Sequence, residues 1–144
     1  MRKSIMSALI LTVLFGLIHT GCDKDSGTDF RDQLIGTWNL VKILANQEGI
    51  QVEIDIGFVG LSEVTLEVRE EGTYTLTQKY ETGETEVTNG TWTATKNTIT
   101  INPDNDEPET MNYKIDGNTA TLGETTFEFD DQTYSVKLVY TKQS

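Results

Sequence analysis

From residue 62 to the end of the chain, short segments alternate apolar with polar residues and are separated by turn-forming residues. In the first segment Val64, Leu66 and Val68 alternate with polar residues, which is the period of a β-strand with one buried face. The connections are too short to hold a crossover helix, so neighbouring strands must be antiparallel. Helix signals are nearly absent, and β-branched and aromatic residues fill the segments. The pattern predicts a meander of hairpins whose exposed edges disappear if the sheet closes into a barrel.

We therefore expect an all-β fold, an antiparallel up-and-down barrel of roughly eight strands with one or two extra short strands. A sandwich of two sheets is the alternative. Within the meander, Asn89-Gly90 is interpreted as a β-bulge that lets a long strand curve. Phe127 and Phe129 are interpreted as an added hairpin arm.

The segment before the regular meander has two interpretations. Val52, Ile54 and Ile56 alternate with acidic residues, and then Gly57-Phe58-Val59-Gly60 breaks the pattern. The clean alternation favours a strand or part of a strand. The alternative is that residues 50–61 form a lid across the barrel mouth, because structureless loops of this length are uncommon unless they are functional.

The N-terminus has the features of a secretory signal. Met1-Arg2-Lys3 is basic, the apolar run over residues 5–18 is shorter than the roughly 20 residues of a membrane span, and Gly21 precedes the break. The chain's single cysteine, Cys22, follows directly. This arrangement resembles a bacterial lipoprotein signal, in which cleavage after Gly21 leaves Cys22 as the first residue with an acylated thiol. The alternative is an ordinary signal peptide followed by a free thiol.

These features predict three parts: a lipoprotein signal peptide at residues 1–21, a lipidated tether at 22–28 and a barrel domain at 29–144. The tether is polar and turn-rich. Fully stretched, the part of it beyond the cysteine spans only about 20 Å, so the domain would sit close to its membrane. Fatty acyl chains such as palmitate would anchor the protein. The expected location is the bacterial cell envelope, on the periplasmic face or at the outer-membrane surface.

Charge and composition exclude several partners and chemistries. The chain carries a net charge of −12, and the signal contains Arg2 and Lys3 but no acidic residue, so the mature chain is more acidic still. Such a surface repels nucleic acid and anionic bilayers. The signal also contains the only histidine, His19. The mature chain then lacks the residues for Ser-His-Asp or Cys-His catalysis and for zinc or copper sites, so no enzyme, cofactor or metal site is expected.

Residues 29–40 mark the start of the fold. Asp29 can cap a single helical turn, Gly36 lets the backbone bend, and a strand with Trp38 on one face follows. A short helix, a glycine and a strand that opens with Trp resembles the start of a lipocalin-like β-barrel. In that family the Gly-x-Trp motif lies at the closed end of the barrel, so the resemblance assigns Gly36 and Trp38 to that end.

Further motifs extend the resemblance over residues 34–142. They are Leu34-Ile35-Gly36-Thr37-Trp38, Glu71-Gly72-Thr73-Tyr74, Gly90-Thr91-Trp92 and the segment 113–122. Together they look like the small bacterial lipocalin-like domains often found on lipoproteins. In larger lipocalins a basic residue near the end of the last strand packs over the first Trp. The resemblance implies this role for Lys142 or, failing that, Lys137.

Six aromatic or apolar residues are candidates for the wall of a ligand cavity. Small barrels are often filled by such side chains, so a solid interior is the alternative. Trp38 is expected to be a core residue rather than a ligand contact. The six candidates are Tyr74, Tyr80, Met111, Tyr113, Phe127 and Tyr134.

Two acidic groupings suggest other sites. Asp104-Asn105-Asp106-Glu107 lacks the glycine and the distal bidentate glutamate of an EF-hand calcium loop, so a solvated loop is expected. Glu84 and Glu86 share a strand face, but the acid pair of a glycosidase normally comes from separate elements, with one acid buried. A carboxylate-based hydrolase is therefore only a third hypothesis.

The expected function is a membrane-anchored, non-catalytic barrel that binds a small apolar or amphipathic ligand. The alternative is a solid-cored module for protein contact in the cell envelope, such as an assembly factor or a protease inhibitor. The two differ in whether the barrel interior is hollow.

Overall fold

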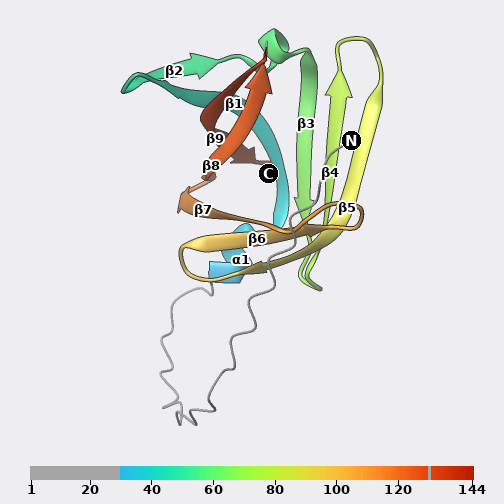
Figure 1. Cartoon of the computed structure of the whole chain (residues 1–144). Helices are drawn as coiled ribbons and strands as arrows, with labels where there is room; N and C mark the ends of the chain where they lie inside the picture. Colours follow the sequence, from blue (N-terminus) through green and yellow to red (C-terminus); the bar gives the residue numbers. More distant parts are fainter. Residues whose placement is uncertain (1–29, 130) are drawn as a thin grey trace, which may run out of the picture.

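The computed structural model describes residues 30–129 and 131–144, without the side chains of residues 47 and 127–129. The predicted signal peptide and tether, including Gly21 and Cys22, lie outside these residues. Most of the described chain is β-strand (Figure 1). In chain order the elements are α1 (Phe30–Leu34), β1 (Gly36–Gln47), β2 (Ile50–Ile54), the 3-10 helix η1 (Ile56–Val59), β3 (Leu61–Val68), β4 (Thr73–Tyr80), β5 (Thr85–Ala94), β6 (Thr98–Pro103), β7 (Glu109–Asp116), β8 (Thr119–Phe129) and β9 (Gln132–Lys142).

The strands form one antiparallel sheet that closes on itself. They are hydrogen-bonded in the order β2-β1-β3-β4-β5-β6-β7-β8-β9, and β1 also pairs with β9. One edge of β1 pairs with two strands. Residues 36–39 pair with β3, and residues 43–47 pair with β2. The closed barrel therefore has eight strands, β1 and β3 to β9, with β2 as an extra strand. The predicted up-and-down barrel with a short N-terminal helix is confirmed.

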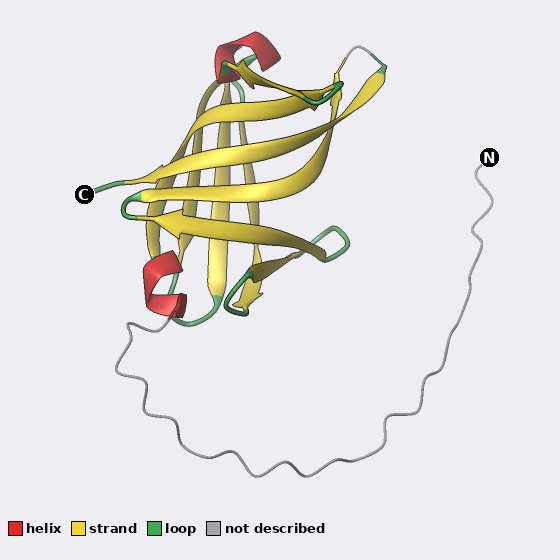
Figure 2. Cartoon of the chain, turned by 90° about the vertical axis from the view of Figure 1, so that its left-hand side faces the viewer, coloured by secondary structure: helices red, strands yellow, loops and turns green. Residues whose placement is uncertain are grey.

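The two ends of the barrel differ. Figure 2 shows α1 and η1, both in red, at opposite ends. We call the end that α1 covers the closed end and the other the open end. At the open end, the backbone N–H of Glu81 donates a 3.0 Å hydrogen bond to the carbonyl of Gly60, which ties the segment after η1 to the β4–β5 turn. No helix in the described residues is long and apolar enough to cross a membrane.

Residues 50–61 are part strand and part helix. β2 contains the alternating residues and, among the described strands, pairs with β1 alone. Asp55 then caps η1, since its Oδ1 accepts a 2.8 Å hydrogen bond from the backbone N–H of Gly57. The favoured interpretation of a partial strand is confirmed, and it lies at the mouth of the barrel rather than within the closed wall.

The predicted hairpin arm at Phe127 and Phe129 is wrong. Both residues belong to β8, which continues without a turn from Thr119 and pairs with β9 along its length. The register shifts between Leu122 and Thr125, and this irregularity bends the strand. A long bulged strand has the same sequence pattern as two short strands, because the bulge interrupts the alternation.

The predicted bulge at Asn89-Gly90 is also wrong. β5 pairs with β4 through both residues without a register shift. Gly90 is instead a site of close approach, because a Cβ there would lie 2.8 Å from Cε1 of Tyr74 and would overlap the carbonyl oxygen of Asn102. A glycine within a strand can mark such an approach as readily as a bulge.

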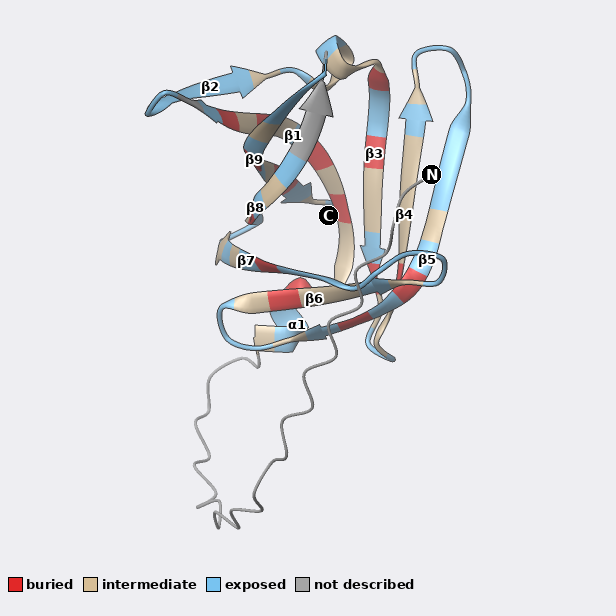
Figure 3. Ribbon diagram, in the orientation of Figure 1, coloured by how far each residue is buried: buried red, intermediate tan, exposed pale blue. Residues whose placement is uncertain are grey.

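The closed half of the barrel is packed solid. Trp38, Tyr74 and Trp92 are each only 2% exposed. In Figure 3 the parts of β5 and β6 next to α1 include buried residues, whereas the part of β5 toward the open end is exposed. The free space around Trp38 is about 10 Å³, room for about one water molecule. It is lined by Leu34, Trp38, Leu66, Val68, Ile99, Ala120, Leu122 and Tyr140.

Candidate functional site

Trp38 fastens α1 to the closed end of the barrel. Its indole Nε1 donates a 2.8 Å hydrogen bond to the carbonyl of Leu34, the last residue of α1. Lys142 Nζ lies 5.2 Å from the centroid of the Trp38 ring and donates a 3.2 Å hydrogen bond to the carbonyl of Gln33. The last carbonyls of a helix have no partner within the helix and carry partial negative charge. The indole and the ammonium therefore cap α1.

Gly36 makes room for Lys142. Its φ of 139° lies in the region that favours glycine, and a Cβ on it would lie 2.6 Å from Cε of Lys142. The three residues that the resemblance assigned to the barrel end, Gly36, Trp38 and Lys142, thus lie together. Lys137 lies instead on the outer face of β9, where it pairs with Leu44 of β1.

A second tryptophan repeats this arrangement at the same end. Trp92 Nε1 donates a 3.0 Å hydrogen bond to the carbonyl of Arg69, and the guanidinium carbon of Arg31 lies 5.1 Å from the Trp92 ring centroid. Because Arg31 belongs to α1, cation–π contacts with both indoles hold the closed end. The repeated Gly-Thr-Trp tripeptide was visible in the sequence. The role of Arg31 was not, because it meets Trp92 only across the folded barrel.

Three of the predicted cavity residues belong to the closed half. Tyr74 and Met111 are buried in the core, so they do not line an open cavity. Burial, with a smaller contribution from the charge of Asp104, raises the pKa of the Tyr74 hydroxyl. The Tyr113 hydroxyl donates a 2.8 Å hydrogen bond to the carbonyl of Thr95, in the β5–β6 turn at the closed end (Figure 1).

The remaining predicted cavity residues belong to the open half. Tyr80 and Tyr134 are half-buried and pack against the core. The side chain of Phe127 lies outside the described residues. Of the six predicted residues, Tyr80 and Tyr134 thus remain as candidates for the wall of an accessible cavity.

The inner face beyond the closed end is apolar, and it is buried at some residues, such as Val64 and Val136, and partly accessible at others. Leu76 and Leu138 face the core in the strand register but are only half-buried. At the mouth, β2 and η1 add Val52, which is 41% exposed, and Phe58, which is 69% exposed. Apolar side chains that face into a barrel and remain reachable from its mouth form a candidate binding site. Sequence alternation identified the inner face but gave no signal of where packing stops.

Two carboxylates also lie on the inner face of the open half. The Tyr80 hydroxyl donates a 2.9 Å hydrogen bond to Glu86 Oε2, and this bond to a carboxylate raises the pKa of the Tyr80 hydroxyl. Thr125 Oγ1, on β8, donates a 2.7 Å hydrogen bond to Glu109 Oε1, on β7. Thr125 pairs with the buried Val136, which places it on the inward side of β8.

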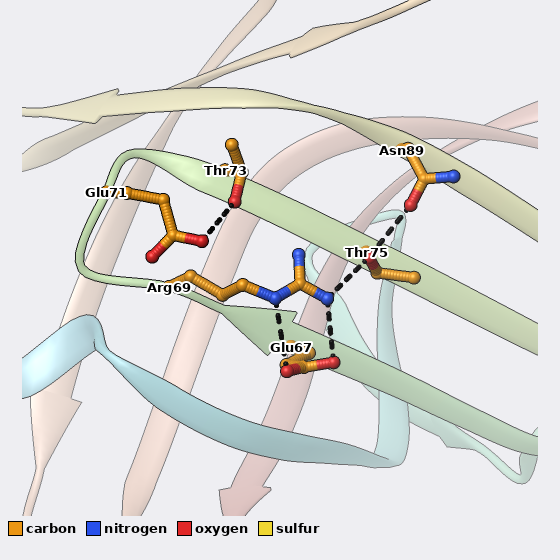
Figure 4. Close-up of polar contacts among 6 residues, drawn as sticks. All are labelled: Glu67, Arg69, Glu71, Thr73, Thr75 and Asn89. Carbon is orange, nitrogen blue, oxygen red and sulfur yellow. Dashed lines mark hydrogen bonds and ion pairs between the residues drawn. The ribbon is translucent and has the colours of Figure 1, made fainter.

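The outer face of β3, β4 and β5 carries a polar network of an ordinary kind (Figure 4). Arg69 donates from Nε and Nη2 to the two carboxylate oxygens of Glu67, at 3.2 and 2.9 Å. Its Nη2 also lies 2.9 Å from Thr75 Oγ1, which donates a 2.8 Å hydrogen bond to Asn89. Glu67, Thr75 and Asn89 are cross-strand partners. Such a row stabilises the sheet surface, and nothing further is required to explain it.

The acidic groupings form no metal centre in the described part of the chain. Within residues 30–129 and 131–144, no three His, Cys, Asp or Glu residues could hold a metal ion. Residues 104–107 form an exposed loop between β6 and β7. Glu84 and Glu86 are both exposed, so neither has the buried environment of a glycosidase acid.

An eight-stranded antiparallel barrel, closed at one end by a tryptophan-capped helix, places this protein in the class of lipocalin-like barrels. The model of the lipocalin-like domain family matches residues 34–122, and the chain belongs to that family. A search of curated proteins gave no match.

Two solved structures from Bacteroides are similar in fold. A lipocalin-like protein from Bacteroides uniformis ATCC 8492 has a TM-score of 0.54 and 15% identity, over 77% of this chain and 99% of that chain. An uncharacterized protein from Bacteroides eggerthii DSM 20697 has a TM-score of 0.52 and 12% identity, over 76% and 98%. At these identities the similarity shows the fold alone.

Proposed function

We propose that this protein is a lipid-anchored lipoprotein of the bacterial cell envelope whose barrel binds a small apolar or amphipathic ligand without catalysis. The observation that carries the proposal is apolar surface on the inner face of the barrel that stays accessible between fully buried side chains such as Val64 and Val136. The closed half is packed around Trp38, whereas Leu76 and Leu138 on the inner face of the open half remain half-buried. Covering apolar surface contributes about 25 cal/mol per Å². A ligand that enters the mouth and covers these side chains therefore gains free energy.

The apolar mouth supports the same function. Val52 and Phe58 are exposed there, next to the half-buried Ile54 and Ile56. An exposed apolar group rimmed by polar residues commonly marks a binding groove. A ligand passing this rim would exchange water for apolar contacts before it reached the interior.

A neutral dye provides the test. We would titrate N-phenyl-1-naphthylamine into the processed chain, residues 22–144 carrying Cys22→Ser, and measure the dye's fluorescence. Dye fluorescence is the better readout because Trp38 and Trp92 both lie at the packed, closed end. We expect saturable binding at one site. Leu76→Trp should fill the interior and weaken binding more than about tenfold, which corresponds to about 1.4 kcal/mol.

The matched control is Thr77→Trp. Thr77 is the next residue on β4 and pairs with Thr65 and Val87 on the outer face. The Thr77→Trp variant adds the same bulk outside the barrel and should leave dye binding unchanged. If the dye does not bind saturably, or binds equally well to both variants, the ligand-binding proposal is wrong. The solid-cored, protein-contact module would then be the better interpretation.

The lipid anchor is the second part of the proposal. It rests on the basic start, the short apolar run and the Gly21-Cys22 junction of the sequence. A domain this acidic does not bind an anionic bilayer by charge, so acyl chains would provide the attachment.

A further inference from the structure

We infer that the ligand of this barrel carries a protonated amine on an apolar body, so that cationic amphiphiles are preferred over fatty acids. This inference rests on the proposed function and specifies the ligand of the same site. It comes from the charges on the inner wall of the open half rather than from the fold.

Strand register places two carboxylates on that wall. Glu86 of β5 pairs with Gln78 of β4, which in turn pairs with the buried Val64 of β3. Glu109 of β7 pairs with Ile101 of β6, which packs against the core. Because side chains directly opposite each other in a sheet share a face, both glutamates are on the inward face.

Each carboxylate is held by a neighbouring hydroxyl and keeps one oxygen available. Tyr80 donates to Oε2 of Glu86 at 2.9 Å, and Thr125 donates to Oε1 of Glu109 at 2.7 Å. Among the described residues, no side chain donates a hydrogen bond to Oε1 of Glu86 or Oε2 of Glu109. An ammonium group supplies three donors and no acceptor, so it suits either of these oxygens. A carboxylate ligand supplies acceptors only.

No positive charge lies on the same wall in the part of the chain that the structure describes. Lys79 and Lys137 point outward, as their pairing with Glu63 and Leu44 shows. Lys142 and Arg31 lie over the two indoles at the closed end. Lys42 and Arg69 form ion pairs with Glu53 and Glu67. Lys114 is exposed on the outer face of β7, and Lys96 is exposed in the β5–β6 turn. A fatty acid entering the mouth would therefore meet negative charges with no compensating cation. An alkylamine would meet the opposite charge at both glutamates.

The size of the preference follows from the exposure of the two carboxylates. Both glutamates are exposed, so each interaction is screened by solvent and is weaker than a buried ion pair. Attraction for the amine and repulsion for the carboxylate add in the comparison of the two ligands. We expect decylamine to bind about tenfold more tightly than decanoate at low salt, with 1-decanol between them. The difference should shrink as salt screens the charges.

The experiment is displacement of N-phenyl-1-naphthylamine from the processed chain by decylamine, 1-decanol and decanoate. The two ionic compounds are used below their micellar concentrations and the alcohol below its solubility limit. The three compounds share an alkyl chain and differ in head group. The same series is repeated on the double variant Glu86→Gln, Glu109→Gln. The control is the double variant Glu70→Gln, Glu71→Gln, an equal loss of charge in the exposed β3–β4 turn. Thermal unfolding verifies that each variant is folded.

The inference is supported if the order is decylamine, decanol, decanoate, and if the Glu86→Gln, Glu109→Gln variant loses most of the preference while the Glu70→Gln, Glu71→Gln variant keeps it. Equal or tighter binding of decanoate overturns the inference and leaves the binding function standing. An amine preference that survives in the Glu86→Gln, Glu109→Gln variant overturns the role of Glu86 and Glu109. Failure of the neutral dye and of all three compounds to bind would refute the binding function itself.

Discussion

Lys142 Nζ lies 5.2 Å from the centroid of the Trp38 ring, and the two residues are also opposite each other in the β1–β9 pairing. The contact therefore joins the first and last strands of the barrel. It also holds α1 in place, because both side chains donate hydrogen bonds to carbonyls of that helix. The Lys142–Trp38 contact therefore helps to close the barrel between β1 and β9 and to hold α1 over its closed end.

Replacing Lys142 with Met should lower the free energy of unfolding by about 1–2 kcal/mol. Methionine keeps much of the aliphatic stem but has no ammonium to lie over Trp38 or to bond to Gln33. Lys142→Arg should cost little or should stabilise, since a guanidinium stacks well on an aromatic ring. Urea unfolding measures both. Lys114→Met, on the exposed outer face of β7, is the control, and an equal loss there would show that the Trp38 contact contributes nothing.

Gly90→Ala should destabilise the barrel by about 2–3 kcal/mol. The added Cβ would overlap the carbonyl oxygen of Asn102 and approach Cε1 of Tyr74 to 2.8 Å. β5 is held between β4 and β6 at this point, so the neighbouring backbone cannot move away freely. Thr91→Ala changes the next, exposed residue and should cost far less. Similar urea midpoints for the two variants would show that the strands can separate here.

The barrel could be predicted from the sequence because alternation assigns each side chain to a face and short turns dictate antiparallel neighbours. The distance of each residue from the mouth of the barrel could not be predicted. Tyr74 and Tyr80 lie on the same face of β4, yet Tyr74 is buried at the closed end and Tyr80 is half-buried in the open half. A period of two gives the face of a residue and not its distance from the mouth.

The contacts that sequence reasoning missed join residues far apart in the chain. Glu109 follows the acidic segment 104–107 in the sequence, and its partner Thr125 is supplied by the next strand. Arg31 reaches Trp92 only because α1 folds back over the closed end. Lys142 over Trp38 was expected from the family resemblance and not from spacing. Local patterns contain no signal for such pairs.

Cys22→Ser should abolish acylation and shift the chain out of the membrane-anchored, processed form. The predicted anchor is attached to the thiol of Cys22, and a serine has no thiol to which these acyl chains can be joined. Incorporation of labelled palmitate and the gel mobility of fractionated cells measure both effects. Ser26→Ala, in the same tether, is the control. If the Cys22→Ser chain is still cleaved after Gly21 and still bound to membranes, the anchor is wrong.

Because of Tyr140, the free energy of unfolding of the barrel should fall at alkaline pH. Burial raises the pKa of its hydroxyl above the usual value of 10.0. The unfolded chain then releases the proton at a lower pH than the folded chain. The contribution to stability is therefore complete below pH 10 and is lost as the pH rises toward the folded-state pKa. Between these two pKa values the loss approaches about 1.4 kcal/mol per pH unit.

Tyr140→Phe removes the ionising group and should flatten this slope. Urea unfolding at several pH values between 8 and 11 gives the slope for each protein. Some slope should remain, because the pKa values of Tyr74 and Tyr80 are raised as well. Tyr134→Phe, which removes the hydroxyl of a half-buried ring that bonds to Gln132, controls for the loss of a hydroxyl. If Tyr140→Phe and the wild-type chain lose stability in parallel above pH 10, the prediction is wrong. The Tyr140 hydroxyl would then ionise as freely in the folded chain as in the unfolded chain. The closed end would be less tightly packed than the 4% exposure of Tyr140 indicates.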